Sequence, residues 1–291
     1  MRVFYSPDYV GAGFAFDTTR KAQWIAESLD ASPIPGIELV EPEPLERWQI
    51  EEVHDPEYVE AVETGNPRSL AESQGFAWDP DLWTMVCASN GGAVAAALAS
   101  LEDGAAGSLS SGLHHAKYDR GEGYCTFNGL ALAARAAVDA GVESVLILDL
   151  DAHCGGGTAS LIEGESRIVQ LDVAVNDFDA YSPSGQGALE IVRKSADYLQ
   201  AVHRMLAAAT ADFGVCLYNA GMDPYERCSS GGLVGITREV LAEREQTVFD
   251  WCRARKLPIA FVLAGGYSGA GLDHAELVDL HRLTLMAASR G

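Results

Sequence analysis

The sequence predicts an α/β fold in which a single-domain parallel β-sheet is sandwiched by helices. Two observations support it: apolar runs of strand length recur along the chain, and amphipathic helical patterns separate them. The expected strands cover residues 145–148, 166–173, 213–219 and 258–263. The expected helices lie at about 188–209, 237–256 and 272–289. No linker, repeat or low-complexity tract divides the chain, so we expect one domain over residues 1–291.

The N-terminal part adds a strand and two helices to this pattern. Residues 1–6 lead into a short strand, and residues 17–29 have helical periodicity. Residues 31–44 are rich in Pro and Glu, which predicts an exposed connection. Pro56 suits an early position of a second helix, with Asp55 as its N-terminal cap.

The next two segments differ sharply in composition. Residues 65–83 mix Gly, Pro and Ser with Phe76, Trp78 and Trp83, which predicts a loop. These aromatic side chains could line the rim of a pocket, or they could pin the loop to the core, as is commoner for Trp. Residues 91–101 are rich in alanine and predict a tightly packed helix.

Composition limits the classes of partner that the protein can have. The 291 residues are 48% apolar and 21% charged, as in an ordinary globular protein. A net charge of −22 without any basic run argues against an extended nucleic-acid surface. The excess of acid would attract a cationic substrate, but a generally acidic surface that maintains solubility explains it equally well.

The N-terminus and the cysteines indicate the compartment. Neither a signal peptide nor an apolar run long enough to cross a bilayer is expected, so we predict no membrane association. The cysteines contain no CxxC pair, which is typical of reduced thiols and predicts a cytoplasmic protein. The six cysteines are at positions 87, 125, 154, 216, 228 and 252.

The stretch from Val145 to His153 carries the clearest chemical signal. A buried apolar strand ends in Asp149, Asp151 and His153, at alternate positions. Side chains two residues apart share one face of an extended chain, so these three groups begin on the same side. Carboxylate oxygens and imidazole nitrogens suit Zn²⁺ or a similar divalent ion. Alternatively, the two acids cap the loop and the following helix.

Polar residues also follow two other expected strands. Residues 219–223 contain Asn219 and Asp223, and residues 264–267 contain two glycines before Tyr267. Ligands of open parallel sheets bind beyond the carboxyl ends of the strands, so the three segments can converge on one pocket. Taken alone, Asp223 is as well explained by turn capping and Tyr267 by packing.

Together with an adjacent pair of histidines, these residues form a complete hydrolytic set. Asp151, His153 and Asp223 would hold a metal ion that polarises a carbonyl and lowers the pKa of bound water to ~7. One of His114 and His115 would accept the proton of that water and pass it to the leaving amine. Tyr267 would donate a hydrogen bond to the developing oxyanion. At least one of the two histidines needs a partner, such as Asp149.

In its ordered set of motifs, the chain resembles the zinc-dependent histone deacetylase and acetylpolyamine amidohydrolase superfamily, which includes bacterial histone deacetylase-like amidohydrolases. The resemblance runs nearly end to end. Its motifs are Tyr5-Ser6-Pro7-Asp8-Tyr9, His54-Asp55-Pro56-Glu57-Tyr58-Val59, Gly112-Leu113-His114-His115-Ala116, Gly123-Tyr124-Cys125-Thr126-Phe127-Asn128, Asp149-Leu150-Asp151-Ala152-His153, Asn219-Ala220-Gly221-Met222-Asp223-Pro224 and Gly265-Gly266-Tyr267.

The resemblance implies an arginase/deacetylase-type fold and assigns the site by position. It makes Asp151, His153 and Asp223 the ligands of Zn²⁺, with Fe²⁺ or Co²⁺ as alternatives. The remaining positions are His114 and His115 as tandem catalytic histidines, Tyr267 as the transition-state tyrosine, Asp149 as support for His114 and for a structural K⁺ or Na⁺, and Gly123 and Tyr124 as a wall of the substrate channel. The implied substrate is a small acylated amine or an acyl-lysine, and homo-oligomers occur in the family.

The chain departs from the family pattern directly after His153. Cys154-Gly155-Gly156 replaces a second His, a Gly and an Asp or Asn. The family's acid or amide at position 156 orients the second tandem histidine, so either another residue replaces it or catalysis is weakened or specialised. Cys154 could be an extra ligand or a redox-sensitive thiol, but a small core residue fits better. Residues 173–187 do not align, so the aromatic group of the second channel wall stays unnamed.

These observations favour a metal-dependent amidohydrolase that deacetylates or otherwise deacylates a linear amide. The first alternative, motivated by Gly156, is a weakened or inactive relative that binds acyl or carbonyl small molecules. A two-metal ureohydrolase needs several bridging acids, which the Cys-Gly-Gly sequence does not supply. A cysteine hydrolase that uses Cys154 or Cys125 is disfavoured, because nothing in the sequence activates either thiol.

Overall fold

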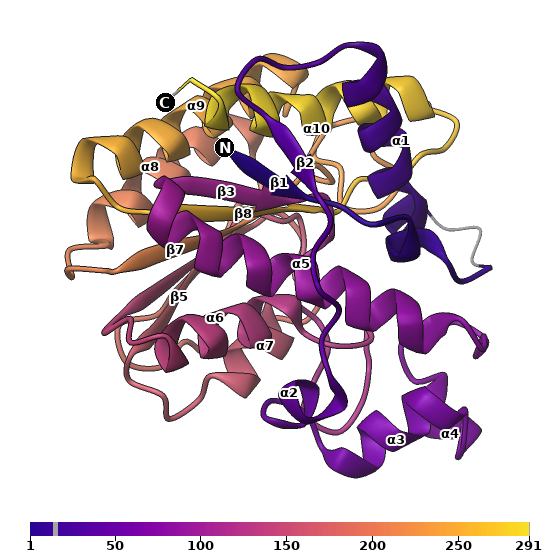
Figure 1. Cartoon of the computed structure of the whole chain (residues 1–291). Helices are drawn as coiled ribbons and strands as arrows, with labels where there is room; N and C mark the ends of the chain where they lie inside the picture. The colour runs from indigo at the N-terminus through magenta and orange to yellow at the C-terminus, as the bar shows by residue number, and fades with distance from the viewer. Residues whose placement is uncertain (14–16, 291) are drawn as a thin grey trace.

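One eight-stranded sheet organises the molecule (Figure 1). The structure is a computed structural model that describes residues 1–13 and 17–290, with only the backbone for residues 17–19. All strand pairs are parallel, in the order β2-β1-β3-β8-β7-β4-β5-β6. The strands are β1 (Arg2–Phe4), β2 (Glu38–Val40), β3 (Ala105–Ser108), β4 (Val145–Asp149), β5 (Ile168–Ala174), β6 (Ala188–Ile191), β7 (Val215–Gly221) and β8 (Ile259–Ala264). The α/β fold class is as predicted.

Helices cover both faces of this sheet (Figure 1). On one face lie α1 (Asp17–Ala31), α8 (Tyr198–Ala208), α9 (Arg238–Arg255) and α10 (His274–Ala288). On the other lie α5 (Leu82–Asp103), α6 (Gly129–Asp139) and the short α7 (Gly156–Leu161). The smaller helices α2 (Arg47–Glu51), α3 (Pro56–Thr64) and α4 (Arg68–Ala71) extend the α5 side, and short 3₁₀ turns occupy Pro7–Val10 and Ser195–Asp197.

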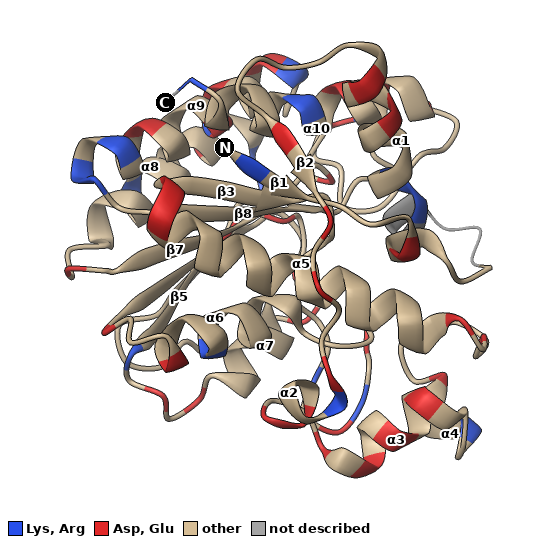
Figure 2. Ribbon diagram, in the orientation of Figure 1, with Lys and Arg blue, Asp and Glu red and all other residues tan. Residues whose placement is uncertain are grey.

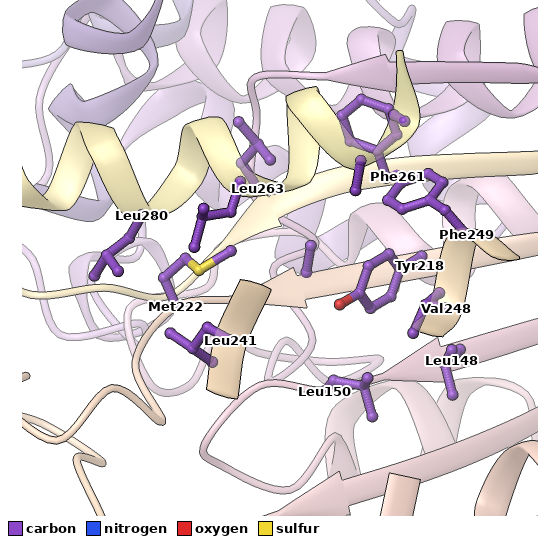
Figure 3. Close-up of a cluster of buried hydrophobic side chains, with 14 of the residues drawn as sticks. Leu148, Leu150, Tyr218, Met222, Leu241, Val248, Phe249, Phe261, Leu263 and Leu280 are labelled. Atoms are coloured by element: carbon purple, nitrogen blue, oxygen red, sulfur yellow. The ribbon is translucent and has the colours of Figure 1, made fainter. Parts of the chain in front are cut away.

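Two hydrophobic cores result, one on each face. Along β4, Leu146 and Leu148 pack into the core beneath α8, α9 and α10, whereas Val145 and Ile147 pack beneath α5 and α6. The alternation follows from the period of two in a strand. Figure 3 shows the first core, where Leu148 and Tyr218 of the sheet face Val248 and Phe249 of α9. Because β4 is buried on both faces, its apolar run is continuous.

Several expected elements differ from the structure. The predicted connection at 31–44 contains the edge strand β2, and β3 was not predicted because its Ala-Ala-Gly-Ser sequence has little strand propensity. Gly107 of β3 is needed there, since a Cβ would lie 2.1 Å from the Phe261 ring. The helix expected over 188–209 was wrong at its start, because residues 188–191 form β6 and α8 begins only at Tyr198.

The long helix α5 needs a second correction. By length and composition it could cross a membrane, although we expected no such run; 72% of its apolar window is buried inside the protein. It packs against α6, β3 and β8, as a core helix does. The acidic charge does not mark a site: Figure 2 shows acidic residues on α1 and α3 and between β2 and α2, rather than gathered in one place.

The capping and loop predictions were tested at α3 and in the segment that follows it. Asp55 caps α3 by accepting a hydrogen bond from the Glu57 backbone N–H, as predicted. The Trp78 indole donates to the Val62 carbonyl at 2.7 Å and so holds the loop to the core. Phe76 instead lies 5.1 Å from the Tyr124 ring, so the two suggested roles of these aromatic residues divide between them.

Candidate active site

Three polar side chains meet at the carboxyl ends of β4 and β7. Potential ligand atoms of Asp151, His153 and Asp223 all lie within 4.8 Å of one another, and the three residues are buried. His153 Nδ1 lies 3.2 Å from Asp151 Oδ1 and 3.0 Å from Asp223 Oδ2. Backbone donors fix both acids: Ala152 N–H donates to Asp223 Oδ1 and His153 N–H to Asp151 Oδ1, both at 3.0 Å.

The charges of this Asp-His-Asp group fit a metal cation. Burial lowers the pKa of His153, but Asp151 and Asp223 outweigh burial and raise the pKa to about 11. Burial and the neighbouring Asp151 raise the pKa of Asp223 to about 6. Two carboxylates buried side by side therefore require a positive charge between them. Their oxygen atoms and the imidazole nitrogen suit Zn²⁺ or a similar divalent ion.

His114 belongs to a buried polar network at the end of β4. Its Nδ1 lies 2.7 Å from Asp149 Oδ2, and the Asn219 amide donates to Asp149 Oδ1 at 2.8 Å. Strand register places Asp149 opposite Asn219, which explains their contact. Burial lowers the pKa of His114, but the charges of Asp149 and Asp151 outweigh it and raise the pKa to about 10. The suggested pairing of a tandem histidine with Asp149 is thus present.

His115 has a different partner, which the sequence analysis missed. Its Nδ1 lies 3.0 Å from Oδ2 of Asp179, a residue of the loop between β5 and β6. Burial and the adjacent His114 lower the pKa of His115 to about 4. The His115 ring is therefore neutral near pH 7 and able to accept a proton. The only sequence signal for Asp179 is an acidic residue shortly after a strand, in the segment 173–187 that did not align.

One cavity joins the groups that the sequence analysis singled out. It has a volume of about 360 Å³ and is lined by His115, Gly123, Tyr124, His153, Asn176, Phe178, Ser230 and Tyr267. Two of these lining residues, Tyr124 and Phe178, are exposed, at 43% and 42%. Phe178 lies in the segment 173–187, for which the sequence analysis named no aromatic group, and it lines this cavity. Its ring lies 4.9 Å from the His115 ring, at 85° to it.

Glycines shape the Tyr267 side of the cavity. Gly265 and Gly266 have φ angles of 55° and 86°, which favour glycine. A Cβ at Gly265 would lie 2.4 Å from Asp223 Oδ1, so only glycine allows the loop to approach the Asp-His-Asp group. Tyr267 itself is partly buried against the core beneath α10 and lines the cavity. The loop thus brings the phenol to the same cavity as His115 and His153.

Neither cysteine that was weighed as a nucleophile is activated in the structure. All six are free and buried. Burial raises the pKa of Cys154 and that of Cys125 to about 12, which disfavours the thiolate that a nucleophile needs. The Cys154 thiol donates to the Asn176 carbonyl at 3.4 Å, as a small core residue does.

Comparison with known proteins identifies the family. The chain matches the histone deacetylase domain over residues 16–277. An uncharacterized protein of Picosynechococcus sp. is 30% identical over 98% of this chain and 97% of its own length. A probable deacetylase of Methanothermobacter thermautotrophicus is 28% identical, over 91% and 83%. Histone deacetylase 2 of Arabidopsis thaliana is 27% identical, over 61% of this chain and 48% of its own length.

Solved structures show the same fold. The HDA15 HD domain superposes with a TM-score of 0.82 at 21% identity, covering 99% of this chain and 89% of that one. Acetylpolyamine aminohydrolase from Burkholderia pseudomallei gives 0.78 at 21% identity, covering 99% and 98%. Fold and family relatives together define a hydrolase of the deacetylase type. The chain belongs to the histone deacetylase domain family.

Proposed function

We propose that this protein hydrolyses the amide bond of an N-acyl amine, with acetyl as the expected acyl group, to a carboxylate and a free amine. The observation that carries the proposal is the shared cavity, which is lined by the neutral imidazole of His115, by Tyr267 and by His153 of the Asp-His-Asp group. Acyl transfer to water needs these functions around one carbonyl group.

The residues divide the chemistry between them. Asp151, His153 and Asp223 would hold the cation, Zn²⁺ or alternatively Fe²⁺ or Co²⁺, which supplies Lewis-acid polarisation of the amide carbonyl and a more acidic water molecule. His115 accepts the proton of the attacking water and donates it to the leaving amine. Tyr267 donates its O–H to the oxyanion that develops on the carbonyl.

His114 and Asp149 complete the set as a hydrogen-bonded pair next to His115. The two imidazole rings lie 4.0 Å apart, and Asp149 holds the inner ring in place. A structural K⁺ or Na⁺ near Asp149 stays a prediction from the family resemblance. So does homo-oligomer formation.

The cavity walls favour a linear amide. Gly123, Tyr124 and Phe178 line the cavity together with His115, so an extended chain that entered it would pack against the two exposed aromatic residues. Both substrate classes named for the similar proteins, acetylated polyamines and acetylated histone tails, present the acyl group on a flexible chain.

The decisive experiment is a deacylation screen on protein of measured metal content. Acetylated polyamines and acetyl-lysine peptides are compared for the chelated protein, the same protein with Zn²⁺ restored, and the Asp223→Ala variant. We expect hydrolysis only with bound metal, a loss of at least about 10³-fold on chelation, and no recovery in Asp223→Ala. Hydrolysis at the wild-type rate by metal-free Asp223→Ala protein would refute the assignment.

The main alternative was a weakened or inactive relative, because Gly156 lacks a side chain to orient His115. Asp179 now provides a carboxylate at His115 Nδ1, so this reason for inactivity no longer holds. Binding of acetylated amines without hydrolysis, at full metal occupancy, would revive the alternative. A binuclear site has no support among the described residues, where the Asp-His-Asp group is the one set of three metal-ligating side chains.

A further inference from the structure

The space beside Gly156, the first residue of α7, is occupied by Asp179. A Cβ added to Gly156 would lie 2.4 Å from Asp179 Oδ1 and 2.7 Å from its Cγ. It would also lie 2.3 Å from the Asp179 carbonyl oxygen. These separations are too short for any side chain. A side chain at position 156 and the carboxylate of Asp179 in its present position therefore exclude each other.

Asp179 is held by contacts on both carboxylate oxygens. Oδ2 faces His115 Nδ1 at 3.0 Å and accepts the Gly157 backbone N–H at 2.9 Å. Oδ1 accepts a short hydrogen bond from the Lys117 ammonium group. Only 8% of the Asp179 side chain is exposed, so these bonds are shielded from water. The carboxylate is thus fixed by two segments, the His115–Lys117 segment and the start of α7.

The backbone of Asp179 is unusual in a way that serves this placement. Its φ angle is +58°, in the left-handed region that most residues with a side chain avoid. Aspartate is among the residues that tolerate this region best. A strained backbone conformation persists where surrounding contacts hold it in place. Here the contacts that hold Asp179 include the one with His115. The left-handed turn also places the preceding Phe178 against the His115 ring.

We propose that Asp179 is the positioning residue of His115 and takes over the task that a side chain at position 156 could otherwise perform. By accepting a hydrogen bond from Nδ1–H, Asp179 fixes the tautomer that leaves Nε2 free for the water and the leaving amine. It also stabilises the imidazolium that forms when His115 takes up a proton. The Lys117 ammonium group, which donates to Oδ1, favours the charged form of the Asp179 carboxylate and fixes its orientation. The inference rests on the proposed function, because His115 is the base in that reaction.

The mutual exclusion of the two positions allows a direct exchange test in the metal-loaded enzyme. Asp179→Gly removes the carboxylate, suits the positive φ angle and frees the backbone at 179 to move. Gly156→Asp in that background returns a carboxylate, and the carbonyl oxygen of residue 179, which would lie 2.3 Å from the new Cβ, must shift to admit it. We expect Asp179→Gly to lower kcat by about 10- to 100-fold with KM and metal content nearly unchanged. We expect the kcat of the double variant to be at least about tenfold higher than that of Asp179→Gly. Gly156→Asp alone should be destabilised, because both carboxylates cannot fit.

Two controls separate positioning from general damage. Asp177→Asn changes a neighbouring exposed acid whose contact is with Arg193, and it should leave kcat unaffected. Asp179→Asn keeps the shape of the side chain and should still lose about tenfold in kcat. A wild-type kcat in Asp179→Gly, or a folded and metal-loaded double variant no faster than Asp179→Gly, would overturn the proposal. If the double variant does not fold, Asp179→Asn decides: wild-type kcat overturns the proposal, and the expected loss supports it.

A readout without turnover distinguishes failure of this inference from failure of the proposed function. The ¹⁵N chemical shifts of the His115 ring, assigned by comparison with His115→Gln, report which nitrogen carries the proton. We expect a single tautomer protonated at Nδ1 in the wild type and averaged shifts in Asp179→Gly. Unchanged shifts would refute the positioning role even in an active enzyme. If the shifts change as expected but no amide is hydrolysed, the proposed function fails instead.

Discussion

His114 and His115 are neighbours in sequence, with rings 4.0 Å apart, yet they occupy opposite electrostatic environments. His114 lies over the strand ends, where Asp149 and Asp151 raise its pKa to about 10. His115 faces the cavity, where burial and the adjacent His114 lower its pKa to about 4. Pairs of titratable groups whose pKa values are pushed apart mark a division between acid and base roles. The contrast supports the proposal that His115 accepts the proton and that His114 carries a fixed charge.

The largest effect should come from the histidine that faces the cavity. His115→Gln removes the group that accepts and returns the proton, so we expect kcat to fall by about 10³-fold. The measurement is steady-state hydrolysis of an acetylated amine, with metal content determined for each preparation. A kcat within threefold of wild type at equal metal content would assign the base to another residue.

Substitution of the inner histidine should have a smaller effect. His114→Gln leaves the cavity surface intact but removes the partner of Asp149 and the charge beside His115. We expect a loss of about 10-fold in kcat, since the group acts through its neighbour. Measured in parallel with His115→Gln, the two rates should differ by about two orders of magnitude. Equal losses would show that the two rings act as one unit, contrary to the division of roles.

The smallest effect concerns stability and should have opposite signs for the two rings. His115 has a folded pKa below the unfolded value of about 6.5, so it disfavours folding as pH falls from 6.5 towards 4. His114 has a folded pKa above that value, so its stabilisation is complete below pH 6.5 and is lost as pH rises towards 10.

Urea unfolding of the metal-free protein at pH 4.5, 6.5 and 8.5 tests these signs. His115→Gln should reduce the loss of unfolding free energy between pH 6.5 and 4.5. His114→Gln should reduce the loss between pH 6.5 and 8.5. If both variants altered the same side of the profile, the two rings would not differ in charge as described.

The partner of His114 could be predicted from the sequence, whereas the partner of His115 could not. Asp149, Asp151 and His153 follow one strand at alternate positions, so a local pattern reveals them, and the strand-end rule adds Asp223. Asp179 and Phe178 follow no such pattern. Their positions depend on a left-handed turn at residue 179 and on the absence of a side chain at Gly156. Such tertiary complementarity leaves no periodic signal.

The fold shows a similar division. Strands buried on both faces, such as β4 and β7, were predicted from their apolar runs. The missed strands lack this signal: β2 and β6 lie at the sheet edges, and β3 consists of small residues beside the Phe261 ring. At β6, the apolar residues Ala188, Leu189 and Ile191 extended the helical pattern of α8 backwards, and pairing with β5 overrode it.

The adjacency of Phe178 and Asp179 ties selectivity to turnover. One peptide bond separates the residue whose ring lines the cavity from the residue whose carboxylate holds His115. A substitution at residue 178 that admits bulkier acyl chains is therefore expected to disturb His115 as well as the cavity lining. An engineer who wishes to broaden the substrate range without slowing the reaction would do better to alter Tyr124, the other exposed aromatic residue that lines the cavity, or to return the carboxylate to α7 first.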